Sequence, residues 1–123
     1  MTRDAHRRIL VVDDNLDSGS IISLLLEQAG WPTVSKLNVR DALDALDDDA
    51  NIGLVVTDVR MPDYDGFDLL RVVKHRFPYL PVILITGQPI VPDDVIPLHA
   101  VILQKPLSAK ELLGAVEENL SRG

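Results

Sequence analysis

The chain has 123 residues, a net charge of −7 and a pI near 4.7. This length suits one domain with a single hydrophobic core, and a composition that is 46% hydrophobic and 25% charged is typical of a globular protein. The acidic balance argues against a surface that binds nucleic acid directly. The chain has no cysteine, which excludes disulfides, thiolate metal sites and cysteine nucleophiles.

The N-terminal region does not have the pattern of a targeting or membrane segment. Basic residues Arg3, Arg7 and Arg8 precede an apolar run, Ile9–Val12, that Asp13 interrupts. This run is too short for the core of a signal peptide or for a transmembrane helix. We therefore expect a cytoplasmic protein that does not insert into membranes.

Apolar strand patterns alternate with helical patterns along the chain. The run Ile9–Val12 predicts a buried strand that ends on Asp13. Residues 15–18, three of which are polar, then supply N-cap candidates for a helix that ends at Gly30. Residues 33–37 predict a short second strand.

A second helix is predicted after Asn38, which can cap it, because residues 42–46 place four apolar side chains on one face. Three consecutive acids, Asp47, Asp48 and Asp49, follow this helix. Negative charge is unfavourable at the carboxyl end of a helix. We therefore interpret these acids as a frayed end and a solvated loop rather than as a metal site.

The central strand is the most apolar part of the chain. Residues 53–58, Gly-Leu-Val-Val-Thr-Asp, show no polar alternation, which predicts a strand buried on both faces. Asp58 would then lie at the carboxyl end of this strand, where open α/β sheets bind ligands. A turn-rich loop and a helix over residues 67–76 follow.

Two further apolar runs, Pro81–Ile85 and Ala100–Leu103, predict the fourth and fifth strands. The fourth strand ends on Thr86, and the fifth leads to Lys105. A last helix follows, with apolar residues at helical spacing up to Leu120.

This alternation predicts an α/β fold with one doubly wound, parallel, five-stranded sheet of flavodoxin-like order 2-1-3-4-5. The segment between the fourth and fifth strands, residues 87–99, contains Pro89, Pro92 and Pro97. Because each interior proline costs a helix about 3 kcal/mol, we expect a short or irregular fourth helix there.

The predicted strand ends gather a distinctive set of polar residues: Asp13 and Asp14, Asp58, Thr86 and Lys105. Two carboxylates about 4 Å apart repel by roughly 4 kcal/mol at an effective dielectric constant near 20, so three of them require a cation or protons. Mg²⁺ fits an all-oxygen ligand set. Lys105 and Thr86 suit a phosphoryl group, toward which Asp58 could act as a carboxylate nucleophile.

Five short motifs resemble, in their order along the chain, the receiver domain of two-component response regulators: Asp13-Asp14, Asp58-Val59-Arg60-Met61-Pro62, Asp65-Gly66, Thr86-Gly87 and Lys105-Pro106. The resemblance runs from Arg8 to about Leu120. It implies that residues 1–123 form one receiver domain with a core of about residues 8–120.

The resemblance also implies the roles of the site residues. Asp58 would be the phosphoacceptor. Asp14 and Asp58 would bind Mg²⁺ directly, together with the backbone carbonyl of Arg60, and Asp13 would act mostly through a water. Thr86 and Lys105 would hold the phosphoryl oxygens, and the Lys105–Pro106 peptide bond would be cis.

The function implied by the resemblance is signal transduction. Asp58 would receive the phosphoryl group from a histidine kinase or a histidine phosphotransfer protein and later lose it to water, as a phosphoacceptor rather than a dedicated enzyme. The domain would signal through contacts with a downstream protein that the sequence does not identify, and it could form a homodimer.

The chain departs from the family in the region that usually transmits the signal. The family has an aromatic residue three positions before the lysine, and here that residue is Ile102. The segment 87–99 is also shorter than usual, so the family's usual output face, built from the fourth helix, fifth strand and fifth helix, is in doubt. We expect this segment to be mobile relative to the sheet.

Three other functions compete with this interpretation. A phosphatase of the haloacid dehalogenase type also has an aspartate nucleophile, but it requires an acid two residues later, where this chain has Arg60. A flavodoxin-type flavin site requires a hydroxyl-rich loop after the first strand, where Asp13 and Asp14 would repel the phosphate. A receiver fold that only binds proteins, without phosphorylation, stays open.

Overall fold

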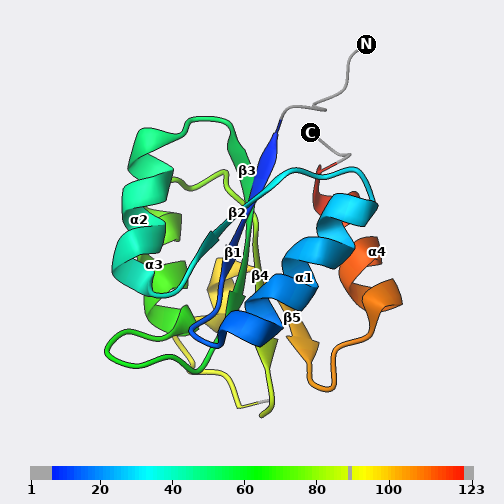
Figure 1. The fold of residues 1–123 in the computed structure, drawn as a ribbon. Helices are drawn as coiled ribbons and strands as arrows, with labels where there is room; N and C mark the ends of the chain where they lie inside the picture. Colours follow the sequence, from blue (N-terminus) through cyan, green and yellow to red (C-terminus); the bar gives the residue numbers. More distant parts are fainter. Residues whose placement is uncertain (1–6, 89, 121–123) are drawn as a thin grey trace.

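Five parallel strands form one sheet in the order β2-β1-β3-β4-β5 in the computed structural model of the chain (Figure 1). The structure describes residues 7–88 and 90–120. The strands are β1 (Arg8–Val12), β2 (Thr33–Lys36), β3 (Ile52–Asp58), β4 (Val82–Thr86) and β5 (Val101–Gln104). The helices are α1 (Leu16–Gln28), α2 (Val39–Asp48), α3 (Gly66–Arg76), the 3-10 turn η1 (Ile96–Leu98) and α4 (Ala109–Leu120). The predicted fold class and strand order are confirmed.

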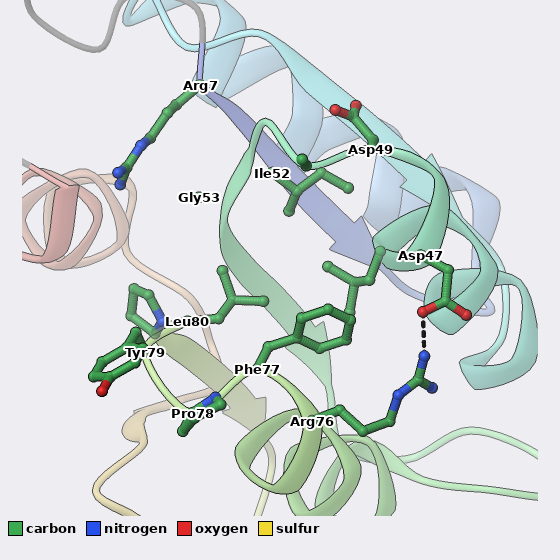
Figure 2. A pocket seen from close by; sticks show the side chains of 13 residues that line it. Arg7, Asp47, Asp49, Ile52, Gly53, Arg76, Phe77, Pro78, Tyr79 and Leu80 are labelled. Atoms are coloured by element: carbon green, nitrogen blue, oxygen red, sulfur yellow. Dashed lines mark hydrogen bonds and ion pairs between the residues drawn. The ribbon is translucent and has the colours of Figure 1, made fainter.

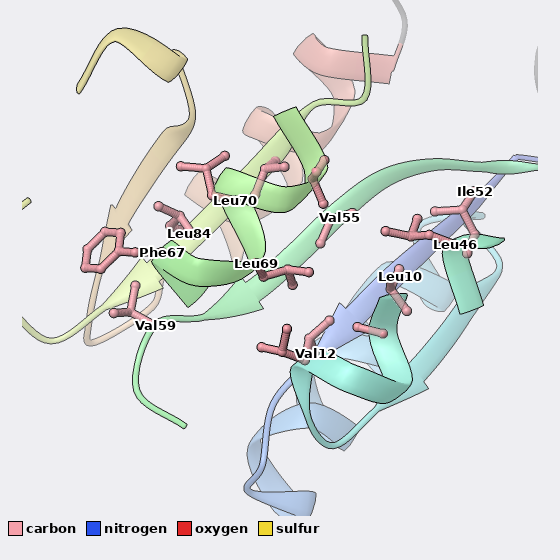
Figure 3. Packing of buried hydrophobic residues seen from close by; sticks show 14 of the residues in the cluster. Leu10, Val12, Leu46, Ile52, Val55, Val59, Phe67, Leu69, Leu70 and Leu84 are labelled. Carbon is pink, nitrogen blue, oxygen red and sulfur yellow. The ribbon is translucent and has the colours of Figure 1, made fainter. Parts of the chain in front are cut away.

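The helices cover the sheet on both faces, with α2 and α3 on one side and α1 and α4 on the other (Figure 1). Alternate residues of each inner strand point to opposite faces. In β1, Leu10 and Val12 pack in the α2 and α3 cluster (Figure 3), whereas Ile9 and Val11 pack in the α1 and α4 cluster. Because helices cover both faces of the sheet, both sets of side chains on β1 are buried, which explains why this strand has no polar alternation.

The central strand β3 is buried at all of its seven residues. It lies between β1 and β4, and helices pack on both of its faces. Asp58 is its last residue, as predicted from the sequence. A carboxylate is thus held at the end of the most buried element of the fold.

The prediction of a frayed helix end at the three consecutive acids is wrong. Asp47 and Asp48 belong to α2, and Asp49 is its C-cap. Asp47 pairs with Arg76 from α3, and the Asp49 carboxylate lies 2.7 Å from the Arg8 guanidinium. These arginines supply the positive charge that the last turn of α2 lacks, so the helix continues through the acids.

The connection between β4 and β5 contains one short 3-10 turn, η1, as its only helical element among the described residues 87–88 and 90–99. This confirms the predicted short or irregular fourth helix, and the helix labelled α4 follows β5 instead. The described part of the connection is anchored to α3, because the Arg71 guanidinium contacts both carboxylate oxygens of Asp94 at 2.6 and 3.1 Å. Its mobility stays a prediction.

Candidate functional site

The strand register places the predicted site residues at one edge of the sheet. Val12 pairs with Thr57, so the next residues, Asp13 and Asp58, lie at the carboxyl ends of neighbouring strands.

Three carboxylates converge at this edge. Asp13, Asp14 and Asp58 each offer one oxygen, and these oxygens all lie within 4.8 Å of one another. Asp13 is 4% exposed and Asp58 is 7% exposed, whereas Asp14 is exposed. The pKa of Asp13 is raised, mainly by burial and also by the nearby negative charge of Asp58. The Asn15 N–H donates to the Asp13 carboxylate at 2.9 Å, and this hydrogen bond opposes the rise in pKa.

This donor set fits Mg²⁺. Magnesium prefers oxygen ligands and usually takes one or two carboxylates together with waters and phosphate oxygens. The three carboxylates each offer one oxygen within 4.8 Å of the others, so this edge of the sheet could supply such ligands. Arg60, whose carbonyl the resemblance adds to this set, lies two residues after Asp58 and lines the same cavity as Asp58.

The amine of Lys105 is already at the acceptor carboxylate. Its Nζ lies 2.9 Å from Oδ1 of Asp58. The lysine side chain is 46% exposed, so this pair contributes little to folding and remains open to exchange of partners. The Lys105–Pro106 peptide bond is cis, as predicted.

The hydroxyl of Thr86 is directed at the following loop. It donates to the Gln88 carbonyl at 2.8 Å and accepts the Gln88 N–H at 3.1 Å. Thr86 is 6% exposed and lines the same cavity as Asp58 and Lys105. The threonine is therefore in the predicted place, with its hydroxyl proton held by the loop.

A cavity of about 330 Å³ lies over Asp58. Besides the predicted site residues, its lining contains residues that were not predicted from the sequence: Val59, Phe67, Gly87, Gln88 and Ile90. The last three directly follow the carboxyl end of β4 or lie a few residues beyond it. The rule that ligands bind outside the carboxyl ends of the strands could have indicated them.

A larger hollow of about 590 Å³ lies at the opposite edge of the sheet, near the ends of α2 and α3 (Figure 2). Two of the charged residues around it form the Asp47–Arg76 pair drawn in Figure 2, and Asp49 is paired with Arg8. None of the site residues predicted from the sequence lines this hollow. The candidate site therefore lies at the smaller cavity.

The loop after β3 packs tightly against the acceptor strand. Asp65 caps α3 in a capping box with Asp68, and the Gly66 N–H donates to the Val59 carbonyl at 2.8 Å. A Cβ atom at position 66 would lie 2.6 Å from the backbone oxygen of Asp58. The close approach explains why a glycine follows the capping aspartate.

Comparison with known proteins agrees with the fold. A family model described as "Response regulator receiver domain" matches residues 9–117. The response regulator receiver protein CpdR of Brucella abortus (strain 2308) is 32% identical over 117 residues, which cover 93% of this chain and 97% of CpdR. A crystal structure of a response regulator receiver protein from Pseudomonas putida has a TM-score of 0.85 at 30% identity, covering 96% of this chain and 98% of that one.

A longer protein shares the same domain. The transcriptional regulatory protein FixJ of Bradyrhizobium diazoefficiens is 34% identical over 120 residues, which cover 95% of this chain but 57% of FixJ. These matches define the class as a signalling domain of two-component systems. The chain belongs to the response regulator receiver domain family. Receiver domains of this family take a phosphoryl group from histidine kinases and generally bind Mg²⁺ at an acidic pocket.

Proposed function

We propose that this domain accepts a phosphoryl group on Asp58 from a phosphohistidine of a histidine kinase or histidine phosphotransfer protein. The observation that carries the proposal is the gathering of three carboxylates within 4.8 Å of one another, with the Lys105 amine 2.9 Å from the central one. A positive group on a nearly buried carboxylate, beside two further acids, suits the transfer of a charged phosphoryl group.

In the transfer step, a carboxylate oxygen of Asp58 attacks the phosphorus, the P–N bond of the phosphohistidine breaks, and the imidazole keeps the bonding electrons and takes up a proton. The product is an acyl phosphate on Asp58. Lys105 moves from the carboxylate to the phosphoryl oxygens, and the Thr86 hydroxyl turns from Gln88 to the same group. Mg²⁺, when bound by Asp13, Asp14, Asp58 and the Arg60 carbonyl, supplies neutralising charge.

Water later attacks the phosphorus and releases phosphate, which restores the Asp58 carboxylate. We propose that the domain is therefore a phosphoacceptor and not a dedicated enzyme, and that it signals through protein contacts. A cytoplasmic location, the absence of direct nucleic-acid binding and a homodimer stay predictions. Over residues 7–88 and 90–120, no helix is both long and apolar enough to cross a membrane.

Binding of beryllofluoride, a mimic of the phosphoryl group, tests the proposal directly. With Mg²⁺ present, we expect it to bind at Asp58 and to shift the amide NMR signals of Thr86, Gly87 and Gln88, because the Thr86 hydroxyl leaves the loop. Omission of Mg²⁺ should abolish the shifts. If no Mg²⁺-dependent binding occurs, the domain is a receiver fold that only binds proteins.

We also expect Mg²⁺ to raise the melting temperature. Only the folded state gathers the three carboxylates, so the ion binds that state selectively. At tenfold its dissociation constant, a ligand adds about 1.4 kcal/mol of stability, which corresponds to roughly 5 °C for a domain of this size.

Two variants give this measurement its controls. Asp14→Asn should keep the fold and blunt the Mg²⁺ response, because Asp14 is exposed and its carboxylate belongs to the cluster. Asp48→Asn removes an exposed acid at the end of α2, outside the cluster, and should respond like the parent. A parent melting temperature unchanged by millimolar Mg²⁺ would indicate a degenerate metal site.

A further inference from the structure

One face of the edge strand β5 is not covered by a helix. A full helix follows each of β1, β2 and β3 and packs on the sheet, whereas the described residues between β4 and β5 form only η1. Ile102 pairs with Leu84, which faces the α2 and α3 cluster, so Ile102 points to that same side. It is 39% exposed, although parallel strands are normally buried on both faces.

An apolar hollow of about 400 Å³ lies beside this exposed strand face. We call it the β5 hollow, and its lining residues are Val91, Val95, Ile96, Ala100 and Ile102. None of them is polar. Ile96, on the η1 side, is 63% exposed. The hollow falls within the size range of ligand pockets, and clustered exposed apolar side chains of this kind mark interaction sites.

The wall of the β5 hollow is held in place. Val95 is buried in the core, and its N–H donates to the Pro92 carbonyl at 3.0 Å. The adjacent Asp94 is held by the two-point contact with Arg71 of α3. At Asp94 and Val95 a partner would therefore meet a part of the surface that exists before binding, which lowers the entropy cost of association there.

The chemistry of the surface defines the partner. The uncovered face of a parallel strand fits a helix, the element that covers the inner strands of this sheet. The sequence from Gln88 to Gln104 has no lysine or arginine but has two acids, Asp93 and Asp94, in a chain of net charge −7. Arg71 neutralises one of these acids, and Asp93 is exposed. Asp93 lies two residues from the lining residues Val91 and Val95, so its charge in an acidic chain favours a positively charged partner.

We propose that the β5 hollow binds an amphipathic helix of a partner protein. The apolar side chains of that helix cover Ile96 and Ile102, and its flanks carry lysine or arginine. The partner's helix then takes the place over β5 that no full helix of the described chain occupies. This proposal concerns the unmodified protein and does not depend on phosphorylation of Asp58.

A titration of the isotope-labelled protein with two synthetic peptides tests the proposal. Both peptides are amphipathic helices of about four turns with leucines on one face, and the polar face carries lysines in one and glutamates in the other. The lysine peptide should shift amide signals between Val91 and Ile102 and leave α1 unchanged. The glutamate peptide should bind at least about tenfold more weakly, because Asp93 and the net negative charge of the chain repel it.

Matched substitutions locate the binding. Ile96→Ser should weaken the lysine peptide about tenfold or more, since it removes an exposed anchor of the hollow. Leu24→Ser removes a comparably exposed side chain, 56% against 63% for Ile96, from α1 and should leave the affinity unchanged. The amide spectrum of each variant shows whether it has kept the fold.

Four results would overturn the proposal. The first is that the lysine peptide does not bind, and the second is that the glutamate peptide binds as tightly as the lysine peptide. The third is that Leu24→Ser weakens binding of the lysine peptide as much as Ile96→Ser does. The fourth is that the parent forms a dimer in sedimentation equilibrium and that Ile96→Ser dissociates this dimer. The last result would make a second copy of this chain the occupant.

Discussion

An Asp58→Asn variant is expected to lose labelling by acetyl phosphate completely while it stays folded. An asparagine amide has no carboxylate oxygen that can form an acyl phosphate. The substitution removes the partner of Lys105, but it also removes one of three clustered negative charges. These effects on stability oppose one another, so the melting temperature should stay within a few degrees of the parent. Intact-protein mass measures the label.

The control for this variant is Asp63→Asn. Asp63 is an exposed acid in the loop after β3, and its φ of 68° is a backbone conformation that asparagine tolerates well. This variant should be labelled like the parent. Stoichiometric label on Asp58→Asn at a physiological Mg²⁺ concentration would move the phosphoacceptor to another residue.

The arrangement of the candidate site could be predicted because it depends on strand ends. The non-alternating run that ends on Asp58 indicated a buried parallel strand, and the alternation of strands and helices indicated the order 2-1-3-4-5. In that order the carboxyl ends of β1 and β3 are neighbours, which brings Asp13 beside Asp58. The side-chain types at these ends then pointed to Mg²⁺ and phosphoryl chemistry without further geometric information.

The hydrogen bonds inside the site could not be predicted in the same way. The Thr86 hydroxyl bonds both to the carbonyl and to the N–H of Gln88, and Lys105 contacts Asp58 directly. Which acceptor a hydroxyl selects depends on the backbone path of the next two residues, which no sequence pattern specifies. The wall formed by Phe67 and Ile90 was missed for a related reason, because it depends on how two loops pack.

Local rules were reliable where they described the backbone and failed where tertiary partners intervened. Prolines at positions 92 and 97 correctly indicated that the described residues between β4 and β5, 87–88 and 90–99, form no α-helix. The helix dipole indicated a frayed end at Asp47, but Arg76 from α3 pairs with that acid. An isolated helix would have no such partner, so the local rule underestimated the length of α2.

The glycine beside the acceptor strand should be the position most sensitive to a single added methyl group. In Gly66→Ala the new Cβ would lie 2.6 Å from the Asp58 oxygen and 2.9 Å from the Val59 Cα atom, both of which are backbone atoms. Overpacking of this kind typically costs about 1–3 kcal/mol. The gain in helix propensity, at most about 1 kcal/mol, does not offset it at the first residue of α3. We expect the melting temperature to fall by roughly 5–10 °C.

Gly114→Ala is the matched control for this substitution. Gly114 lies within α4, and a Cβ there would have no neighbouring atom within 4 Å. Alanine should therefore stabilise the protein, by up to about 1 kcal/mol, through helix propensity alone. Because the Gly66 clash moves the backbone of Asp58 itself, Gly66→Ala should also slow labelling by acetyl phosphate, whereas Gly114→Ala should not. Equal melting temperatures and labelling rates for the two variants would mean that the loop after β3 relaxes freely and does not hold the acceptor in place.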